Sequence, residues 1–201
     1  LKESGIELGR GVKVNRFLET NIKDIYAIGD CAEQHKAIGQ RRNIEAVWYT
    51  GRMMGETLAQ TICCNKTEYK PGHWFNSAKF LDIEYQTYGW VFSEIGKKEN
   101  ETYFQWQHPK EQKCITISFD KNTNQFLGIN TFGIRMRHDI FNKWLTENQT
   151  INHVLENLVD ANFDPEFYKL YESEIVEKFN KENNTSIQTK KKSWKRIFSK
   201  A

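Results

Sequence analysis

Apolar residues recur at helical spacing over one stretch in the first third of the chain. In residues 44–62 the apolar and small residues keep to one face of a 3.6-residue period, which predicts an amphipathic helix. Gly51 and Gly55 lie on that face, and because they carry no side chain they predict close approach to another backbone. Upstream, residues 22–28 predict a short buried strand that runs into a Gly-Asp pair.

The pattern changes to alternation beyond residue 71. Pro71-Gly72 interrupts the chain. The segments that then predict strands are residues 78–85, 88–92, 102–107, 114–119 and 125–131. Residues 120–124 predict a hairpin connection, because alternation stops before them and apolar residues resume after them. Short polar turns between most segments favour an antiparallel sheet in a second domain.

Three helices are predicted to follow the sheet, over residues 137–147, 151–159 and 165–179. The third has the clearest start signals. Asp164 is suited to cap the free amides, Pro165 to the first helical position, and Glu166 to the positive end of the helix dipole.

These patterns predict an α+β chain in three parts. Residues 1–70 hold the short strand and the long helix, residues 71–183 hold the sheet and its closing helices, and residues 184–201 form a basic tail. The length of 201 residues leaves room for two small domains. With 38% hydrophobic residues, 6 Trp, 8 Tyr and 13 Phe, the chain is too apolar and aromatic for a disordered one.

The charge of the chain is uneven. The formal net charge is +3, but six cationic residues near the C-terminus account for it and leave −3 for the rest. These are Lys190, Lys191, Lys192, Lys195, Arg196 and Lys200. A mildly acidic body argues against a nucleic-acid partner. No apolar run approaches the ~20 residues of a membrane span, and no signal peptide is visible, so we expect no transmembrane segment and a cytoplasmic location.

The cysteines and histidines show no metal-type spacing. The four cysteines, Cys31, Cys63, Cys64 and Cys114, form no CxxC pair, and we expect free thiols. The histidines, His35, His73, His108, His138 and His153, are scattered, so a metal site is not expected.

The Gly-Asp pair after the predicted strand is the strongest candidate for chemistry. A strand's carboxyl end is where open α/β sheets bind ligands, and Gly29 lets a bulky group approach the backbone. The Asp30 carboxylate would repel a phosphate, so a sugar-alcohol hydroxyl that donates to it is the sensible partner. The alternative is that Asp30 only caps the helix that follows.

The segment TNIKDIYAIGDCAE, residues 20–33, resembles the second flavin motif of the FAD-dependent pyridine nucleotide-disulfide oxidoreductase superfamily. That motif reads T-x-x-x-x-I-Y-A-x-G-D, and the matched residues are Thr20, Ile25, Tyr26, Ala27, Gly29 and Asp30. The resemblance implies that residues 1–70 are the end of a Rossmann-like FAD-binding fold. It also implies that Gly29, Asp30, Cys31 and Ala32 bind the cofactor, with Asp30 at the ribityl chain.

A second similarity lies at the start of the predicted long helix. Glu45 and Trp48 are similar to the Glu-x-Trp of oxygenase-coupled ferredoxin reductases, with one extra residue between them. The resemblance implies that Trp48 lies beside the flavin. Trp48 also falls on the apolar face, where a core tryptophan is an equally suitable interpretation.

The third similarity opens the second domain. Residues 74–89 are similar to the F-W-S-D-Q-Y-x-x-x-L-Q-x-x-G opening of the same reductases' C-terminal domain. Asn76 stands where those enzymes have a flavin-proximal Trp, and Ala78 where they have Asp. The resemblance covers roughly residues 1–135 and implies an interface domain that forms a homodimer. Aromatic residues in the strands fit that role: Phe80, Tyr85, Tyr88, Trp90, Phe104 and Trp106.

The resemblance implies that the intact protein passes electrons from NAD(P)H through FAD to an acceptor. That acceptor is a ferredoxin or rubredoxin, nitrite through further domains, a disulfide, or dioxygen. No G-x-G-x-x-G follows a strand here, so the FAD diphosphate site and the NAD(P)H site are expected outside this chain, with no catalytic residue within it. The chain alone is then inactive. The alternative is a non-catalytic dimerisation or docking module.

Two charged segments leave their interpretation open. Arg135, Arg137 and His138 suit a nucleotide phosphate, an acidic partner protein, or simply a solvated helix start. In the tail, Trp194, Ile197 and Phe198 share one face of a short basic helix, which suits an anionic membrane surface, an acidic groove, or no partner at all.

Overall fold

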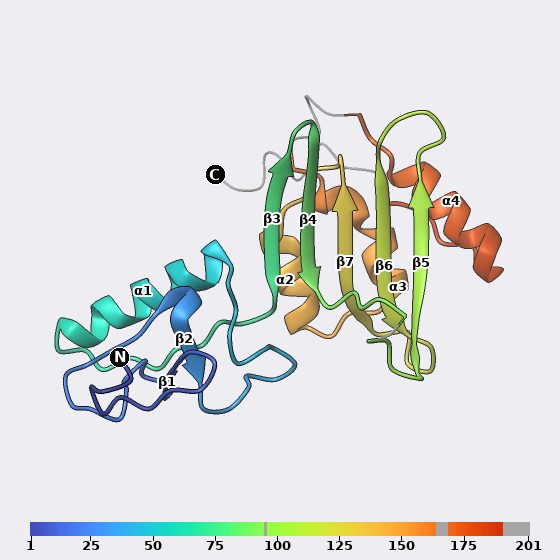
Figure 1. The fold of residues 1–201 in the computed structure, drawn as a ribbon. Coiled ribbons are helices and arrows are strands. Elements are labelled where there is room, and N and C mark those ends of the chain that lie inside the picture. Colours follow the sequence, from blue (N-terminus) through green and yellow to red (C-terminus); the bar gives the residue numbers. More distant parts are fainter. Residues whose placement is uncertain (95, 164–168, 191–201) are drawn as a thin grey trace, which may run out of the picture. The chain divides into compact units, whose positions relative to one another are not determined.

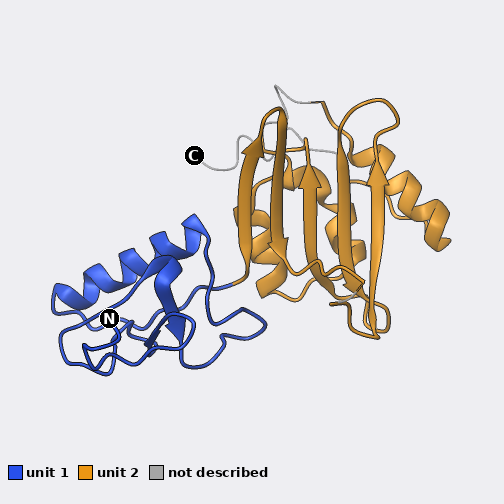
Figure 2. Ribbon diagram, in the orientation of Figure 1, with its two compact units in different colours: residues 1–72 blue, residues 73–201 orange. Residues whose placement is uncertain are grey.

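The computed structural model describes residues 1–94, 96–163 and 169–190. The chain divides into two compact units, Leu1–Gly72 and His73–Ala201 (Figure 2). Helices and an antiparallel sheet both occur, which confirms the α+β class. The roles given to residues 1–70, 71–183 and 184–201 stay predictions.

Unit 1 is built on a two-stranded parallel sheet and one long helix (Figure 1). Strand β1 (Val12–Val14) pairs with β2 (Ala32–Gln34), and α1 (Trp48–Ile62) follows. A single 3-10 turn, η1 (Gly29–Cys31), leads into β2. The buried hydrophobic residues of this unit are Val12, Val14, Leu18, Ala27, Ala32, Met54 and Tyr69.

The predicted buried strand over residues 22–28 is wrong. The Ile25 amide donates to the Ile22 carbonyl at 3.2 Å, and Asp24 between them has a φ of 63°, so these residues form a turn. Ile25 and Ile28 are exposed, and a single bridge joins Tyr26 to Glu19. An apolar run alone does not distinguish an extended segment from a paired strand. The strand of this region is β2, after the Gly-Asp pair.

The long helix begins at Trp48, four residues later than predicted from periodicity. A buried ion pair holds the preceding segment out of the helix: Arg41 Nη2 lies 3.0 Å from Glu45 Oε2, with only 5% and 8% of the two side chains exposed. The Thr50 hydroxyl, in the first turn of α1, donates to the same oxygen at 3.3 Å. Val47 is extended, with φ −137°, and ends this segment.

Unit 2 contains a five-stranded antiparallel sheet, which confirms the prediction for residues 72–135. The strands are β3 (Phe75–Phe80), β4 (Ile83–Gly89), β5 (Glu101–Gln107), β6 (Cys114–Asp120) and β7 (Phe126–Phe132). Their order across the sheet is β3-β4-β7-β6-β5 (Figure 1).

Two of the predicted strands are misplaced. Residues 78–85 span a hairpin turn at Leu81, which has a φ of 51°, because the apolar run continues through the tip. Residues 88–92 extend beyond the end of β4, where Gly89 has a φ of 67° and turns the chain. The hairpin at residues 120–124 is confirmed: Asp120 accepts from the amides of Asn122 and Thr123, each at 2.8 Å.

Four short helical segments follow the sheet or lie along it. They are α2 (His138–Thr146), α3 (Ile151–Glu156), the 3-10 turn η2 (Leu158–Ala161) and α4 (Glu172–Asn183). The first two predicted helices are confirmed, the second ending earlier. The helix described in the region of the third begins at Glu172, since residues 169–171 are not helical, and the start predicted at residues 164–166 lies outside the described residues. Among the described helices, none is long and apolar enough to cross a membrane.

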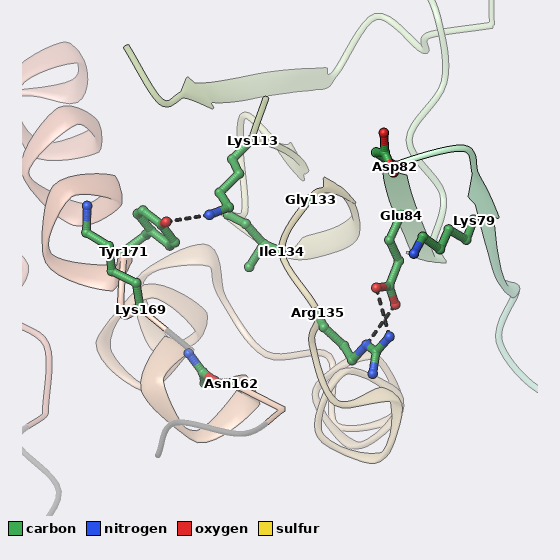
Figure 3. A pocket seen from close by; sticks show the side chains of 10 residues that line it. All are labelled: Lys79, Asp82, Glu84, Lys113, Gly133, Ile134, Arg135, Asn162, Lys169 and Tyr171. Atoms are coloured by element: carbon green, nitrogen blue, oxygen red, sulfur yellow. Dashed lines mark hydrogen bonds and ion pairs between the residues drawn. The ribbon is translucent and has the colours of Figure 1, made fainter. Parts of the chain in front are cut away.

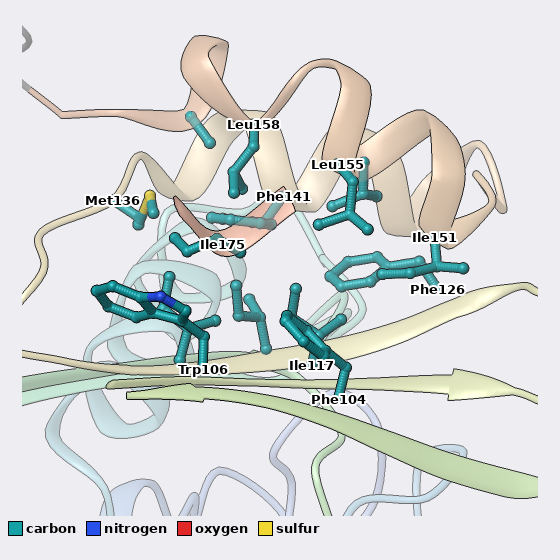
Figure 4. Packing of buried hydrophobic residues seen from close by; sticks show 14 of the residues in the cluster. Phe104, Trp106, Ile117, Phe126, Met136, Phe141, Ile151, Leu155, Leu158 and Ile175 are labelled. Carbon is teal, nitrogen blue, oxygen red and sulfur yellow. The ribbon is translucent and has the colours of Figure 1, made fainter. Parts of the chain in front are cut away.

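The core of unit 2 lies between one face of the sheet and these helices (Figure 4). Alternate residues of β6, Ile115, Ile117 and Phe119, face the core because successive side chains of a strand point to opposite faces. Phe141 of α2 is fully buried against Tyr88, with ring centroids 5.0 Å apart. The helical apolar faces and the alternating strands therefore close one shared core.

We predict that Glu45→Gln lowers the free energy of unfolding of unit 1 by about 3–5 kcal/mol, because it leaves the buried Arg41 charge uncompensated. Glu56→Gln is the matched control, since Arg52 and Glu56 form the same spacing of ion pair with about 60% of each side chain exposed. The control should cost about 0.5 kcal/mol or less. Urea unfolding measures both, and equal losses would contradict the buried pair.

For unit 2 we predict that Phe141→Ala lowers the free energy of unfolding by about 3–5 kcal/mol, through lost burial and a cavity in the core. Leu81→Ala, at a side chain that is 94% exposed, should change it by about 0.5 kcal/mol or less. Both changes in the free energy of unfolding are measured from the urea midpoint for unfolding of unit 2. A Phe141 variant as stable as the Leu81 variant would reject this packing.

Candidate functional site

The Gly-Asp pair lies in η1, and hydrogen bonds hold the separate turn before it, at residues 20–25. The Thr20 hydroxyl lies 3.1 Å from the Ile22 carbonyl and 2.9 Å from the Ile25 carbonyl, so one side chain closes the turn. The Ala27 amide then donates to the Leu18 carbonyl at 3.2 Å. The chain between this turn and η1 is extended, and Gly29 at its end lies next to Gly51 of α1.

Gly29 is the point where α1 meets the turn. Its φ of +74° is in the left-handed region that favours glycine, and its amide donates to Met54 Sδ at 3.3 Å. A β carbon built on Gly51 would lie 3.5 Å from the Gly29 Cα, and one on Gly55 would lie 3.9 Å from Ile28 Cδ1. The predicted close approach of this helix face to another backbone is confirmed.

Asp30 is exposed and makes no hydrogen bond or ion pair with the described residues. The interpretation that Asp30 caps a helix is wrong. The N-cap of η1 is Ile28 and that of α1 is Val47, neither with a side-chain cap bond. The carboxylate therefore keeps its acceptor capacity for a partner outside the described chain.

The space around Gly29 fits a bound group. A β carbon built on Gly29 would meet no atom within 4 Å. This open side lies next to an exposed carboxylate, whose chemistry suits hydroxyl donors and disfavours phosphate. The residues present thus fit the sugar-alcohol portion of a flavin nucleotide.

The other residues predicted to bind a cofactor differ in exposure. Cys31 is exposed, and its thiol lies 3.4 Å from the Ile28 carbonyl. Ala32 is fully buried in β2, where its methyl group belongs to the core and its amide donates to the Gly29 carbonyl. Trp48 opens α1 with 68% of its surface exposed, and the core interpretation of this residue is wrong. Its ring packs edge-on against Tyr49, with centroids 5.0 Å apart.

Sequence reasoning missed the polar network beside α1. The sequence marks Glu45 only through its spacing to Trp48, whereas its partners are Arg41 and Thr50. Tyr69 lies in the same region, and burial raises the pKa of its phenol to about 12, so the ring stays neutral. Arg41 and Glu45 are four residues apart, but outside a helix that spacing carries no signal.

The four cysteines are free, with Cys63 and Cys64 exposed at the end of α1. Burial raises the pKa of the Cys114 thiol, which disfavours its reactive thiolate form. Across residues 1–94, 96–163 and 169–190, no group of three or more His, Cys, Asp and Glu is placed to hold a metal ion.

The cationic cluster of unit 2 is largely neutralised within its own unit. Arg135 binds Glu84 through two hydrogen bonds of 2.8 and 2.9 Å, and Arg137 lies 2.9 Å from Asp139. His138 packs edge-on against Phe75, and burial lowers the pKa of its imidazole. The simple picture of a solvated helix start is wrong for His138.

Comparison with known proteins gives matches to both units. Residues 1–55 match the family described as "Pyridine nucleotide-disulphide oxidoreductase". Coenzyme A disulfide reductase of Staphylococcus aureus (strain bovine RF122 / ET3-1) is 28% identical over 147 residues, covering 71% of this chain and 31% of that protein. Rubredoxin-NAD(+) reductase of Acinetobacter baylyi is 59% identical over 32 residues, 16% of this chain and 8% of that protein.

Solved structures share the fold over most of the chain. Reduced Bacillus anthracis CoADR-RHD superposes with a TM-score of 0.62 at 21% identity, covering 91% of this chain and 36% of its own. An NAD-dependent persulfide reductase from A. fulgidus gives 0.61 at 16% identity, covering 91% and 37%. The chain spans 31% of the length of the Staphylococcus aureus relative, and the family match covers the turn with Gly29 and Asp30. The similarity to the pyridine nucleotide-disulphide oxidoreductase family is thus shown for residues 1–55.

Proposed function

We propose that the intact protein is an FAD-dependent oxidoreductase that passes electrons from NAD(P)H through flavin to an acceptor. The observation that carries the proposal is the Asp30 carboxylate, exposed and unpaired among the described residues, next to the open side of Gly29. The family match over residues 1–55 supports it. Bound flavin supplies the chemistry of accepting a hydride from the nicotinamide and passing its electrons on.

This chain's own residues would bind and orient the cofactor. Asp30 accepts a hydrogen bond from a ribityl hydroxyl, and Gly29, Cys31 and Ala32 contribute backbone at the same turn. The amino end of α1 carries partial positive charge, and the helix packs against Gly29 through Gly51. That charge favours an anion beside Gly29, such as a reduced flavin. The exposed Trp48 at the first position of α1 offers an aromatic surface to the same cofactor.

The electron acceptor is proposed at the level of class only. The relatives by name reduce rubredoxin and coenzyme A disulfide, so an electron-carrier protein and a disulfide are the two supported classes. No catalytic cysteine is proposed within this chain. Because the chain spans a minor part of its relatives' length, we propose that it is inactive by itself and that the nicotinamide site lies elsewhere in the intact protein.

We predict that Asp30→Ala weakens FAD binding by the intact protein about 5- to 150-fold, which corresponds to about 1–3 kcal/mol for a lost hydrogen-bond acceptor. Flavin content after purification and quenching of flavin fluorescence on titration measure the effect. Glu7→Ala is the control, because it removes the same charge from another exposed position in unit 1. Wild-type affinity in the Asp30 variant would remove the residue from the site.

The same titration on the 201-residue chain tests whether this chain by itself is a flavoprotein or a docking module. Stoichiometric quenching of FAD by this chain would favour an autonomous flavoprotein, whereas no binding would favour the module.

A homodimer through unit 2 is also proposed, with only part of the predicted aromatic set at its centre. Of the six strand aromatics predicted for this role, Tyr88, Phe104 and Trp106 are buried in the unit's own core, so their role as an interface excess is wrong. The support comes instead from a row on the opposite sheet face. Tyr85 stacks on Phe80 at 5.9 Å and contacts Phe132 at 6.0 Å between centroids.

We predict that the intact protein sediments as a dimer at micromolar concentration and that Phe80→Ser shifts it toward monomer, because a largely exposed aromatic is lost from the interface. Ile62→Ser, at an equally exposed apolar side chain of unit 1, is the control and should leave the dimer intact. A monomeric parent protein would contradict this interface.

A further inference from the structure

A charged pocket opens in unit 2, at the end of the sheet where β3 turns into β4 (Figure 3). Its lining comes from that hairpin, the residue before β6, the connection after β7, the residue after η2, and the segment before α4. The hollow has a volume of about 160 Å³. It is separate from the turn at Gly29 in unit 1, so a ligand in this pocket would be independent of the proposed function.

Close backbone packing forms the floor of the charged pocket. Gly133 has a φ of +65°, and a β carbon on it would lie 2.5 Å from the Gln112 carbonyl oxygen. Its amide donates to the Glu84 carbonyl at 2.7 Å, which ties the floor to β4. Ile134, the next residue, is buried. The hollow is therefore part of the fold and does not depend on one surface side chain.

Charged side chains from different elements form its two walls. Four cationic and two acidic side chains line the pocket, a net charge of +2. On one wall Glu84 holds the Arg135 guanidinium through two hydrogen bonds. On the other, Lys113 Nζ donates to the Tyr171 hydroxyl at 2.6 Å (Figure 3). Lys113 also forms an ion pair with Glu111, which lies outside the lining, so the remaining positive charge of the pocket belongs to Lys79 and Lys169.

Two lysines keep most of their donor capacity. Lys79 makes no hydrogen bond or ion pair within the described ranges of the chain. Lys169 lies 3.9 Å from Glu111 Oε1 and over the Tyr171 ring at 5.1 Å, and its side chain is exposed. An ammonium group has three donors, so both side chains are available to an anion in the hollow.

We propose that the charged pocket binds a phosphate group, either as free phosphate or as the end of a small organic phosphate. A phosphate ester carries about −1.5 to −2 charge at neutral pH and three strong acceptor oxygens, and inorganic phosphate is also an anion with several acceptor oxygens, so both suit a positively charged lining. Lys79 and Lys169 supply the donors, and the fixed Arg135 supplies positive charge nearby. Asp82 and Glu84 share the hairpin wall with Lys79, whereas Lys169 lies beside Tyr171 on the opposite wall (Figure 3).

The test is calorimetric titration of inorganic phosphate into the 201-residue chain in a low-salt buffer without other oxyanions. We expect saturable binding at one site, weakening as salt is added. The double variant Lys79→Gln/Lys169→Gln should bind about tenfold more weakly, since each lysine contributes a partly exposed charge interaction. Lys2→Gln/Lys181→Gln is the matched control, because it removes the same charge from exposed positions away from the pocket.

Glycerol 3-phosphate distinguishes the two sources of the ligand. Competition with inorganic phosphate would show that the pocket takes a phosphate ester, and no competition would assign it to free phosphate. The proposal is overturned if the parent chain shows no saturable phosphate binding, if the pocket variant binds like the parent, or if the control variant loses as much. None of these results depends on flavin, so they leave the assignment of Asp30 untouched.

Discussion

The contact between α1 and the turn at Gly29 is the constraint on which the candidate site depends. The helix approaches this backbone closely because Gly51 presents no side chain, and a β carbon there would be 3.5 Å from the Gly29 Cα. The Met54 side chain lies next to this contact, and its sulfur accepts a hydrogen bond from the Gly29 amide. Two glycines on a helix lower its intrinsic stability by about 1 kcal/mol each relative to alanine. Packing against the turn offsets that loss and sets the position of Asp30.

The ion pair of Arg41 and Glu45 holds the segment that precedes α1, and so also helps to position this helix. A buried pair is weak evidence of net stability, because desolvation of both charges opposes their attraction. Its consequence here is positional. By sharing Glu45 Oε2 with the Thr50 hydroxyl, it ties the extended segment to the first turn of α1 and determines that the helix begins at Trp48. Trp48 is consequently the first helical residue, and most of its side chain is exposed.

Sequence periodicity identified which segments are helices and strands better than where they begin and end. The alternation in β5, β6 and β7 was sufficient, because the apolar side chains of each strand that face the helices are buried in the core. It failed at residues 78–85, because Phe80, Leu81 and Ile83 are apolar while the turn between them is exposed. Periodicity reports burial, and an exposed apolar tip gives a strand-like signal without a strand. The network of Arg41, Glu45 and Thr50 could not be found, because its geometry exists only after folding.

The motif around residues 20–30 shows how a short pattern combines structural and binding roles. Thr20 closes a turn with its hydroxyl, Ala27 is buried in the core of unit 1, and Gly29 supplies a left-handed backbone conformation. Each of these roles can be read from contacts inside the chain. Asp30 has no such role: it caps no helix and pairs with no described residue. A charged side chain held at a fixed backbone position, without an intramolecular partner, is explained best by a partner that the fold presents it to. In the proposed function, that partner is the ribityl chain of a bound flavin, placed beside the open side of Gly29.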